Sequence, residues 1–451
     1  MIRLDDAPVH EFLPDDALSD QIPDLADAHR RLLDGEGAGS DMLGWRDLLL
    51  NPDDALIEDI EATAAHLRRD ADVLLCLGIG GSYLGARAVI DALTPYFPSP
   101  DASSPGSEAA DADDDVDGRS TDPSRPPEIL FAGHHTSGRY LRELLDRLEG
   151  TSVYVNVISK SGTTLETALA FRFVRQWMED RFADASDRII ITTDPETGAL
   201  NALHAERNYK KYVIPRDVGG RFSVLTPVGL LPIAAAGIDI RSLFYGAVSM
   251  CESLSRREPV ASMDALRYAG IRALLLEQGY DLEVLAVFEP ALRGVGSWWQ
   301  QLFGESEGKD NTGLFPSVVQ YTTDLHSLGQ YMQDGQRTMM ETFLMAEDDG
   351  GDLDIPASED NLDDLNYVAG TSLSDVTRGA YEGTLRAHTD GGVPSITLWM
   401  DRIDAESVGA LLYFFEHAVA VSGYLIGVHP FNQPGVEDYK REMYRRLGRD
   451  D

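Results

Sequence analysis

The sequence has 451 residues, 43% of them hydrophobic, a length that exceeds one hydrophobic core and predicts two domains. Its 76 acidic and 38 basic residues give a net charge of −38. This charge disfavours nucleic acid as a partner, because phosphate binding needs a basic surface. Because acids spread over the whole chain repel one another unless salt screens them, the composition predicts a salt-rich, halophilic cytoplasm. The alternative is an acidic mesophilic enzyme with an acidic insert.

Two cysteines and one apolar run bear on the compartment. Cys76 and Cys251 lie in apolar patterns, which predicts buried thiols in a reducing compartment. The opening residues MIRLDDAPVHEF lack the basic start and apolar core of a signal peptide. The apolar run 408–428 contains Glu416 and His417, so we predict a buried helix there rather than a membrane span. We therefore expect a cytoplasmic protein that does not bind membranes.

The first half of the chain begins with helical spacing and continues with a strand and helix rhythm. Residues 1–70 are predicted to be helices that pack on the body of the protein. Residues 71–240 are predicted to form a first α/β domain. Within it, 98–127 is rich in proline, serine and acidic residues, which indicates an exposed, mobile loop. The first predicted strand begins at residue 72, and the others lie at 128–133, 153–159, 188–193 and 211–215.

The second half repeats the rhythm. A helical stretch over 240–278 is predicted to lead into a second α/β domain at 241–428, followed by a C-terminal helical segment at 429–451. Alternating strands and helices favour mostly parallel sheets covered on both faces, so each domain is predicted to be a three-layer α/β/α unit. The predicted strands lie at 282–290, 338–347 and 395–400, and the long helix at 405–428.

Two turns in the first domain could hold an anion. Gly78-Ile79-Gly80-Gly81-Ser82 follows a strand and opens a helix, which directs backbone N–H groups outward. Tyr83 stands where a dinucleotide fingerprint needs glycine, and no P-loop ending follows. A phosphate site and a structural turn therefore remain equally open for this stretch.

The second turn, Ser159-Lys160-Ser161-Gly162-Thr163-Thr164, offers four hydroxyls and a lysine at another strand-to-helix junction. This donor set suits a phosphate monoester, whereas helix capping needs only one hydroxyl. No cluster of histidine, cysteine or carboxylate has the spacing of metal ligands, so no metal or cofactor is expected. The sequence favours a protein that acts on a phosphorylated metabolite.

Glu305 lies in the stretch QQLFGESEGK at 300–309, where an apolar helical pattern gives way to a loop. A carboxylate in such a partly buried place can act as a general base. The alternative is that Glu305 and Glu307 are two solvated acids of an acidic protein.

With these stretches in place, the chain strongly resembles the glucose-6-phosphate isomerase family, also called phosphoglucose isomerases. Four separated stretches carry the resemblance: GIGGSYLGA at 78–86, SKSGTTLE at 159–166, QQLFGESEGKD at 300–310 and HPFNQPGVEDYK at 429–440. Two more support it, GGRFS at 219–223 and TTDLHSLGQ at 322–330. Six ordered motifs are far more specific than any one of them.

The resemblance implies two sugar-isomerase (SIS-type) domains, a homodimer and no metal or cofactor. It also implies interconversion of glucose 6-phosphate and fructose 6-phosphate through a cis-enediolate, as in glycolysis and gluconeogenesis. Segment 429–451 would complete the active site. The implied catalytic residues are Glu305 as base, Arg221 for the enediolate charge, and His326 and Lys440 for ring opening, with His326 supplied to the neighbouring subunit's site. The implied substrate-binding residues are Ser82, Ser159, Lys160, Ser161, Thr164, Gly220, Gln301 and Gln433.

Several alternatives remain open at this point. His326 could be a core histidine, Lys440 a surface lysine, and Arg221 the partner of one of the many acids. The protein could act on mannose 6-phosphate or an amino sugar phosphate, since specificity at C2 depends on few contacts. It could also be a sugar-phosphate-binding regulator that catalyses nothing. The adjacent His134 and His135 are expected to lie in a polar loop rather than to bind metal.

Overall fold

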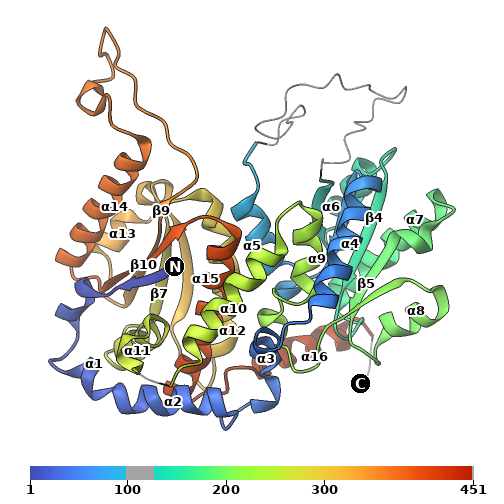
Figure 1. Cartoon of the computed structure of the whole chain (residues 1–451), viewed down its shortest axis with the longest axis horizontal. Coiled ribbons are helices and arrows are strands. Elements are labelled where there is room, and N and C mark those ends of the chain that lie inside the picture. Colours follow the sequence, from blue (N-terminus) through green and yellow to red (C-terminus); the bar gives the residue numbers. More distant parts are fainter. Residues whose placement is uncertain (98–125, 258, 449–451) are drawn as a thin grey trace. The chain divides into compact units, whose positions relative to one another are not determined.

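A computed structural model describes residues 1–97, 126–257 and 259–448, and its contacts divide the chain into two compact units (Figure 1). Unit 1 comprises Met1–Asp41 and Tyr245–Asp451, and unit 2 comprises Met42–Phe244. Each contains a five-stranded, mostly parallel sheet, which confirms the predicted α/β fold class. Helix α10 (Ile240–Leu254) contains the boundary. Of the predicted loop at 98–127, residues 98–125 lie outside the described ranges.

The sheet of unit 2 is entirely parallel, with strand order β3-β2-β4-β5-β6. Its strands are β2 (Val73–Leu77), β3 (Glu128–Ala132), β4 (Val153–Ile158), β5 (Ile189–Thr193) and β6 (Lys210–Val213). Its helices are α3 (Gly44–Leu50), α4 (Asp54–Asp70), α5 (Leu84–Leu93), α6 (Gly138–Arg147), α7 (Leu165–Arg181), α8 (Ala199–Arg207) and α9 (Pro227–Ala235).

Both faces of this sheet are buried, and successive side chains of each strand point to opposite faces. Leu75 and Val155 pack with Phe171 and Val174 of α7 in one core cluster, whereas Ile158 packs with Val228 of α9 in another. Because successive side chains of a strand point to opposite faces, a strand covered on both sides reads as a continuous apolar run. Strands β2 and β4 are accordingly buried at every position.

The sheet of unit 1 has the order β1-β10-β9-β7-β8, with only β1 antiparallel to its neighbour. Two of its strands, β1 and β8, were not predicted. Its strands are β1 (Ile2–Asp5), β7 (Leu282–Val287), β8 (Phe315–Gln320), β9 (Met339–Asp348) and β10 (Ser395–Arg402). Its helices are α1 (Ala17–Asp20), α2 (Ile22–Asp34), α11 (Asp264–Glu277), α12 (Arg293–Glu307), α13 (Gly329–Asp334), α14 (Leu373–Asp390), α15 (Ala405–Leu425) and α16 (Glu437–Arg446).

Helices cover both faces of this second sheet. Tyr381 of α14 and Met332 of α13 pack with Phe343 and Val284 on one face, while α11 and α12 each pack against α15. Helix α15 is long and apolar enough to cross a membrane, but 89% of its most apolar stretch is buried inside the protein. The prediction of a buried helix there is confirmed.

The segment expected to be helical over 1–70 divides between the units. Residues 1–41 group with the sheet of unit 1, to which β1 adds an edge strand, and residues from Met42 onward group with unit 2. The short IRLD run therefore forms a strand where helix was expected, because alternate side chains of Ile2 and Leu4 are buried against the sheet.

Candidate active site

The Ser159–Thr164 loop joins β4 to α7 in unit 2 and is held together by its own hydroxyls. Ser159 Oγ accepts a hydrogen bond from Gly162 N (3.0 Å), and Ser161 Oγ accepts from Thr163 N (3.1 Å). Thr164 is the N-cap of α7, yet its hydroxyl makes no capping bond and lies 3.4 Å from Ser159 Oγ. Simple capping therefore does not account for the threonine at 164.

Tight packing fixes the shape of this loop. Gly162 has φ of +70°, and a Cβ there would lie 2.7 Å from Leu200 N. Ala199 N donates to Ser161 O at 3.3 Å, and Thr193 Oγ1 of β5 donates to Ser159 O at 2.8 Å. The hydroxyls and N–H groups of the loop are thus presented on a rigid turn at the carboxyl end of the sheet, where α/β proteins bind ligands.

The Gly78–Ser82 turn and the Gly219–Ser223 segment pack directly against each other in unit 2. A Cβ at Gly81 would lie 1.9 Å from Gly220 O, so only glycine allows this approach. Ser223 Oγ donates to Gly220 O at 2.7 Å. Arg221 is buried. Ser82 and Arg221 are therefore held on two turns in direct contact.

Lys160 connects the first loop to the same region. Its Nζ donates to Arg216 O (2.8 Å) and Val218 O (3.2 Å). Burial lowers the pKa of this half-buried ammonium, an effect that the nearby Asp194 and Asp217 carboxylates oppose. Contacts within unit 2 thus connect the segments that carry its predicted site residues, which are Ser82, Ser159, Lys160, Ser161, Thr164, Gly220 and Arg221.

In unit 1, Glu305 lies in the last turn of α12. Gln301 Nε2, one turn earlier, donates to Glu305 Oε1 at 3.0 Å, as expected for side chains at i and i+4. This contact orients the carboxylate and places two predicted site residues together. Glu305 is neither fully buried nor fully exposed.

The burial of Glu307 contradicts the alternative that Glu305 and Glu307 are both solvated acids. Glu307 is 1% exposed, and both its oxygens accept from the Arg272 guanidinium, at 2.6 and 2.8 Å. Arg272 also donates to Glu283 Oε2 (2.5 Å) and to Ser422 Oγ (2.9 Å). This network, which joins α11, β7, α12 and α15, was not predicted from the sequence. Its signal was a lone arginine at 272 and a lone glutamate at 283, each inside an apolar run.

A lysine links the end of α12 to the C-terminal segment. Lys309 Nζ donates to Ser306 O at 2.9 Å and also to His429 O. The chain that follows His429 carries Gln433, exposed ahead of α16, and Lys440 within α16. Lys440 Nζ forms an ion pair with Glu437 at 2.9 Å, so in this structure it has the setting of a surface lysine.

His326 lies in a short 3₁₀ turn, Thr323–His326, after β8. It is exposed, which contradicts the alternative of a core histidine. Within residues 1–97, 126–257 and 259–448, its imidazole has no hydrogen-bond partner. The structure therefore does not bring His326 to the other site residues of its own unit by any bond.

The adjacent His134 and His135 follow β3 and form an aromatic cluster. His134 stacks on Tyr83 with ring centroids 4.7 Å apart, and His135 meets Tyr140 edge-on at 4.2 Å. Burial lowers the pKa of His134, and the neighbouring His135 adds to this effect. Among the residues that the structure describes, no group of three or more histidines, cysteines or carboxylates could hold a metal.

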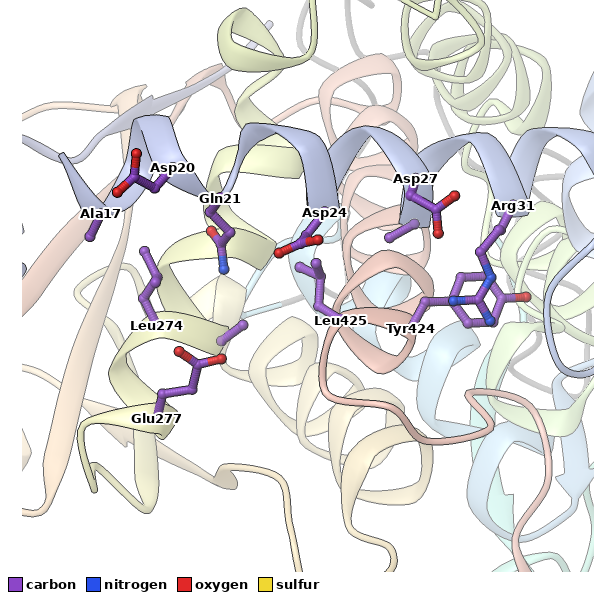
Figure 2. A pocket seen from close by; sticks show the side chains of 12 residues that line it. Ala17, Asp20, Gln21, Asp24, Asp27, Arg31, Leu274, Glu277, Tyr424 and Leu425 are labelled. Carbon is purple, nitrogen blue, oxygen red and sulfur yellow. The ribbon is translucent and has the colours of Figure 1, made fainter.

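Unit 1 also has an acidic pocket of about 410 Å³ beside α2 and α11. Figure 2 shows the side chains of Asp20, Asp24 and Glu277 around it, with Arg31 lying over the ring of Tyr424. None of the predicted site residues lines this pocket. We therefore do not assign the active site to it.

Comparisons with known proteins agree on one family. The family model described as phosphoglucose isomerase matches residues 123–345 and 371–447. The glucose-6-phosphate isomerase of Fusobacterium nucleatum is 46% identical over 449 residues, which cover 99% of this chain and 96% of that protein. The glucose-6-phosphate isomerase of Staphylococcus saprophyticus is 46% identical over 450 residues with the same coverage.

Solved structures share the fold. A hypothetical protein from Thermus thermophilus superposes with a TM-score of 0.85 at 28% identity, covering 100% of both chains. A glucose-6-phosphate isomerase from Chlamydia trachomatis has a TM-score of 0.70 at 19% identity, covering 88% of this chain and 73% of that one. From the family model and the full-length relatives together, the chain belongs to the phosphoglucose isomerase family.

Proposed function

We propose that this protein interconverts glucose 6-phosphate and fructose 6-phosphate, a step of glycolysis and gluconeogenesis. The observation that carries the proposal is 46% identity to glucose-6-phosphate isomerases over 99% of the chain. The rigid hydroxyl-rich loop in unit 2 and the oriented carboxylate on α12 in unit 1 support it. The reaction is redox-neutral overall, so it can proceed by proton transfers to and from side chains.

We assign the phosphate to the Ser159–Thr164 loop. Its four hydroxyls match the oxygens of a phosphate monoester, with Ser161 exposed at the tip and Thr164 free of capping. Lys160 contributes its backbone N–H in this assignment, because its ammonium donates to carbonyls elsewhere. The remaining substrate contacts are assigned to Ser82, Gly220, Gln301 and Gln433.

The chemistry is assigned to four side chains. His326 and Lys440 open the sugar ring by moving protons at the ring oxygen and the anomeric hydroxyl. Glu305 then takes the proton from C2 and returns it to C1. The cis-enediolate formed between these transfers is negatively charged, and the Arg221 guanidinium stabilises it without exchanging a proton. Gln301 keeps the Glu305 carboxylate oriented during both transfers.

The direct test is conversion of fructose 6-phosphate to glucose 6-phosphate in molar KCl with excess chelator, followed by NMR. We expect chelator-insensitive turnover, lost in Glu305→Gln while substrate still binds. The matched control is Glu277→Gln, an exposed glutamate of the acidic pocket, which should retain full activity. Full activity in Glu305→Gln would refute the mechanism. If the folded wild type is inactive on fructose 6-phosphate but converts mannose 6-phosphate or an amino sugar phosphate, the protein is an isomerase of that sugar phosphate. If it only binds these sugar phosphates, the regulator hypothesis is favoured.

We further propose a homodimer in which each site receives His326 from the neighbouring subunit. The imidazole of His326 is exposed and has no hydrogen-bond partner among the residues that the structure describes, which supports this arrangement. The segment between β9 and α14, residues 349–372, also exposes apolar side chains, with Leu362 87% and Tyr367 82% accessible. Figure 1 shows it extending beyond the ends of these two elements. Exposed apolar side chains on a projecting segment suit contact with a second copy of the chain.

Subunit mixing tests this shared site. Glu305→Gln and His326→Ala should each be inactive alone. Statistical heterodimers contain one site with both residues intact, so mixing after mild dissociation should restore about a quarter of wild-type activity. No recovery from folded, mixed dimers would place His326 in the site of its own subunit. Light scattering of Leu362→Asp/Tyr367→Asp should show monomers if the segment forms the interface.

We also propose a halophilic origin and a cytoplasmic location. The net charge of −38 supports high salt, because a Debye length of about 3 Å in molar salt removes most of the repulsion. Both cysteines are buried, as suits a reducing compartment. Dialysis to low ionic strength should unfold the protein, as seen by circular dichroism. Full stability there would refute the halophilic assignment.

A further inference from the structure

Three successive carbonyls ahead of Arg221 are held by groups from distant parts of unit 2. Lys160 Nζ donates to Arg216 O and to Val218 O, and Gly44 N donates to Asp217 O at 3.0 Å. Val218 N closes the turn on Pro215 O at 3.2 Å. The turn at 215–218 is therefore fixed from two directions.

A side-chain contact fixes the same turn to the loop after β5. The Arg216 guanidinium donates to both oxygens of Asp194, each at 3.1 Å. Asp194 also accepts from the N–H groups of Glu196 (2.9 Å) and Thr197 (2.7 Å). Of these anchors, only Lys160 belongs to the loop to which we assign the phosphate.

Two glycines precede Arg221. Gly219 and Gly220 have no side chains to hold the backbone direction. After them, Ser223 N and Ser223 Oγ both donate to Gly220 O, at 3.3 and 2.7 Å. The segment that presents Arg221 is thus fixed on one side by Ser223 and on the other by the turn that Lys160 holds.

The Lys160 ammonium is committed to this contact. An ammonium has three donors and no acceptor, and here two carbonyls take donors from a half-buried group. We propose that Lys160 is a positioning residue, whose side chain joins the phosphate loop to the turn that fixes Arg221. The inference rests on the proposed function, because it presumes that Arg221 stabilises the enediolate.

The chain offers a matched control in Lys211. Its Nζ donates to Pro195 O and Asn201 Oδ1, both at 2.6 Å, so it is also a lysine that joins separate segments of unit 2, here β6 to the loop after β5 and to α8. Its contacts do not include the turn at 215–218. Lys160→Met and Lys211→Met therefore remove similar bonds with different predicted consequences.

In Lys160→Met we expect kcat to fall about 10- to 100-fold, because displacing a catalytic group by about 1 Å can cost up to about 100-fold. KM for fructose 6-phosphate, and inhibition by inorganic phosphate, should change less than about threefold, because the phosphate loop keeps its own donors. Lys160→Arg should restore part of kcat, and Lys211→Met should keep it. A raised KM with unchanged kcat would instead make Lys160 a phosphate ligand. An equal loss of kcat in Lys211→Met would indicate a general structural effect. Either result overturns the proposal.

Two further measurements isolate the path through Arg221. In an Arg221→Met background, Lys160→Met should cost little more activity, whereas an additive loss would overturn the proposal. Hydrogen exchange of the amides at 216–223 should quicken in Lys160→Met and not in Lys211→Met. This readout needs no turnover, so an inactive wild type would refute the proposed function alone. Unchanged exchange in Lys160→Met would refute the positioning role alone.

Discussion

Removal of the Arg272 guanidinium should destabilise unit 1 strongly. Arg272 is 1% exposed and lies between Glu283 and Glu307, which are 0% and 1% exposed. Its four hydrogen bonds to them and to Ser422 range from 2.5 to 2.9 Å. Its guanidinium also lies over the ring of Phe303, 4.3 Å from the centroid. Arg272→Met keeps much of the apolar volume but leaves two carboxylates buried without a cation.

The expected loss follows from those two carboxylates. Removing one partner of a buried ion pair typically costs about 3–5 kcal/mol of the free energy of unfolding, because the remaining charge is uncompensated. Glu283 keeps the hydroxyls of Tyr268 (2.6 Å) and Thr342 (2.8 Å). Glu307 loses the donors to both of its oxygens. We therefore expect about 3–5 kcal/mol, most of it from Glu307.

Urea unfolding at a fixed KCl concentration, followed by tryptophan fluorescence, measures this loss without changing the ionic strength. The control is Arg378→Met, which breaks a 2.6 Å pair with Glu347 between half-exposed side chains and should cost less than about 1 kcal/mol. Arg272→Met/Glu283→Gln/Glu307→Gln should recover much of the stability, since none of the three side chains then carries a charge. A loss within 1 kcal/mol in Arg272→Met, or a triple variant no more stable than the single one, would refute the reasoning.

Two pH-dependent effects should also be measurable by unfolding. Burial raises the pKa of Glu416, whose oxygens have no hydrogen-bond partner among the described residues. Folding therefore retains a proton there, and stability should fall by up to about 1.4 kcal/mol per pH unit above the ordinary glutamate pKa. Glu416→Gln should remove that slope, and an unchanged slope would contradict a neutral Glu416. The Arg216 guanidinium, followed by the N–H groups of Glu196 and Thr197, lowers the pKa of Asp194. The stabilisation by ionised Asp194 should be complete above the ordinary aspartate pKa and lost as the pH falls below it. Asp194→Asn should therefore be less stable than wild type at neutral pH and equally stable in acid. A difference in stability that does not change with pH would contradict this.

Strand prediction succeeded where burial left a clear pattern in the sequence. VLLCL in β2 and VYVNVI in β4 are buried at every position, and such runs are typical of central parallel strands. The sequence FPSVVQ of β8 contains a proline and a serine, and its side chains are mostly half-exposed or exposed. Proline is tolerated there because β8 is an edge strand. The edge strands β3 and β6 were predicted, whereas β1 and β8 were missed because IRLD has only four residues and FPSVVQ has no continuous apolar run.

Much of the candidate site could be predicted because its residues lie in continuous motifs. The Ser159–Thr164 loop is one turn with its donors next to one another in sequence, and Gln301 and Glu305 share one helix turn. The partners of Lys160 are carbonyls more than fifty residues away, and every residue has a carbonyl. A sequence shows that a lysine is present but not which carbonyls it reaches, so its positioning role could only come from the structure.

Glu283 and Glu416 mark the limit most clearly. Each is a single glutamate within an apolar run, in LEVLAV and in FFEHAV, and each is at most 1% exposed. The first has a guanidinium and two hydroxyls around its carboxylate, whereas the second has no hydrogen bond within the described ranges. A buried carboxylate with a cation keeps its charge, and one without a partner becomes neutral. The sequence places both acids inside apolar runs, but the sign of their effect on stability depends on a partner that folding supplies from another helix or strand.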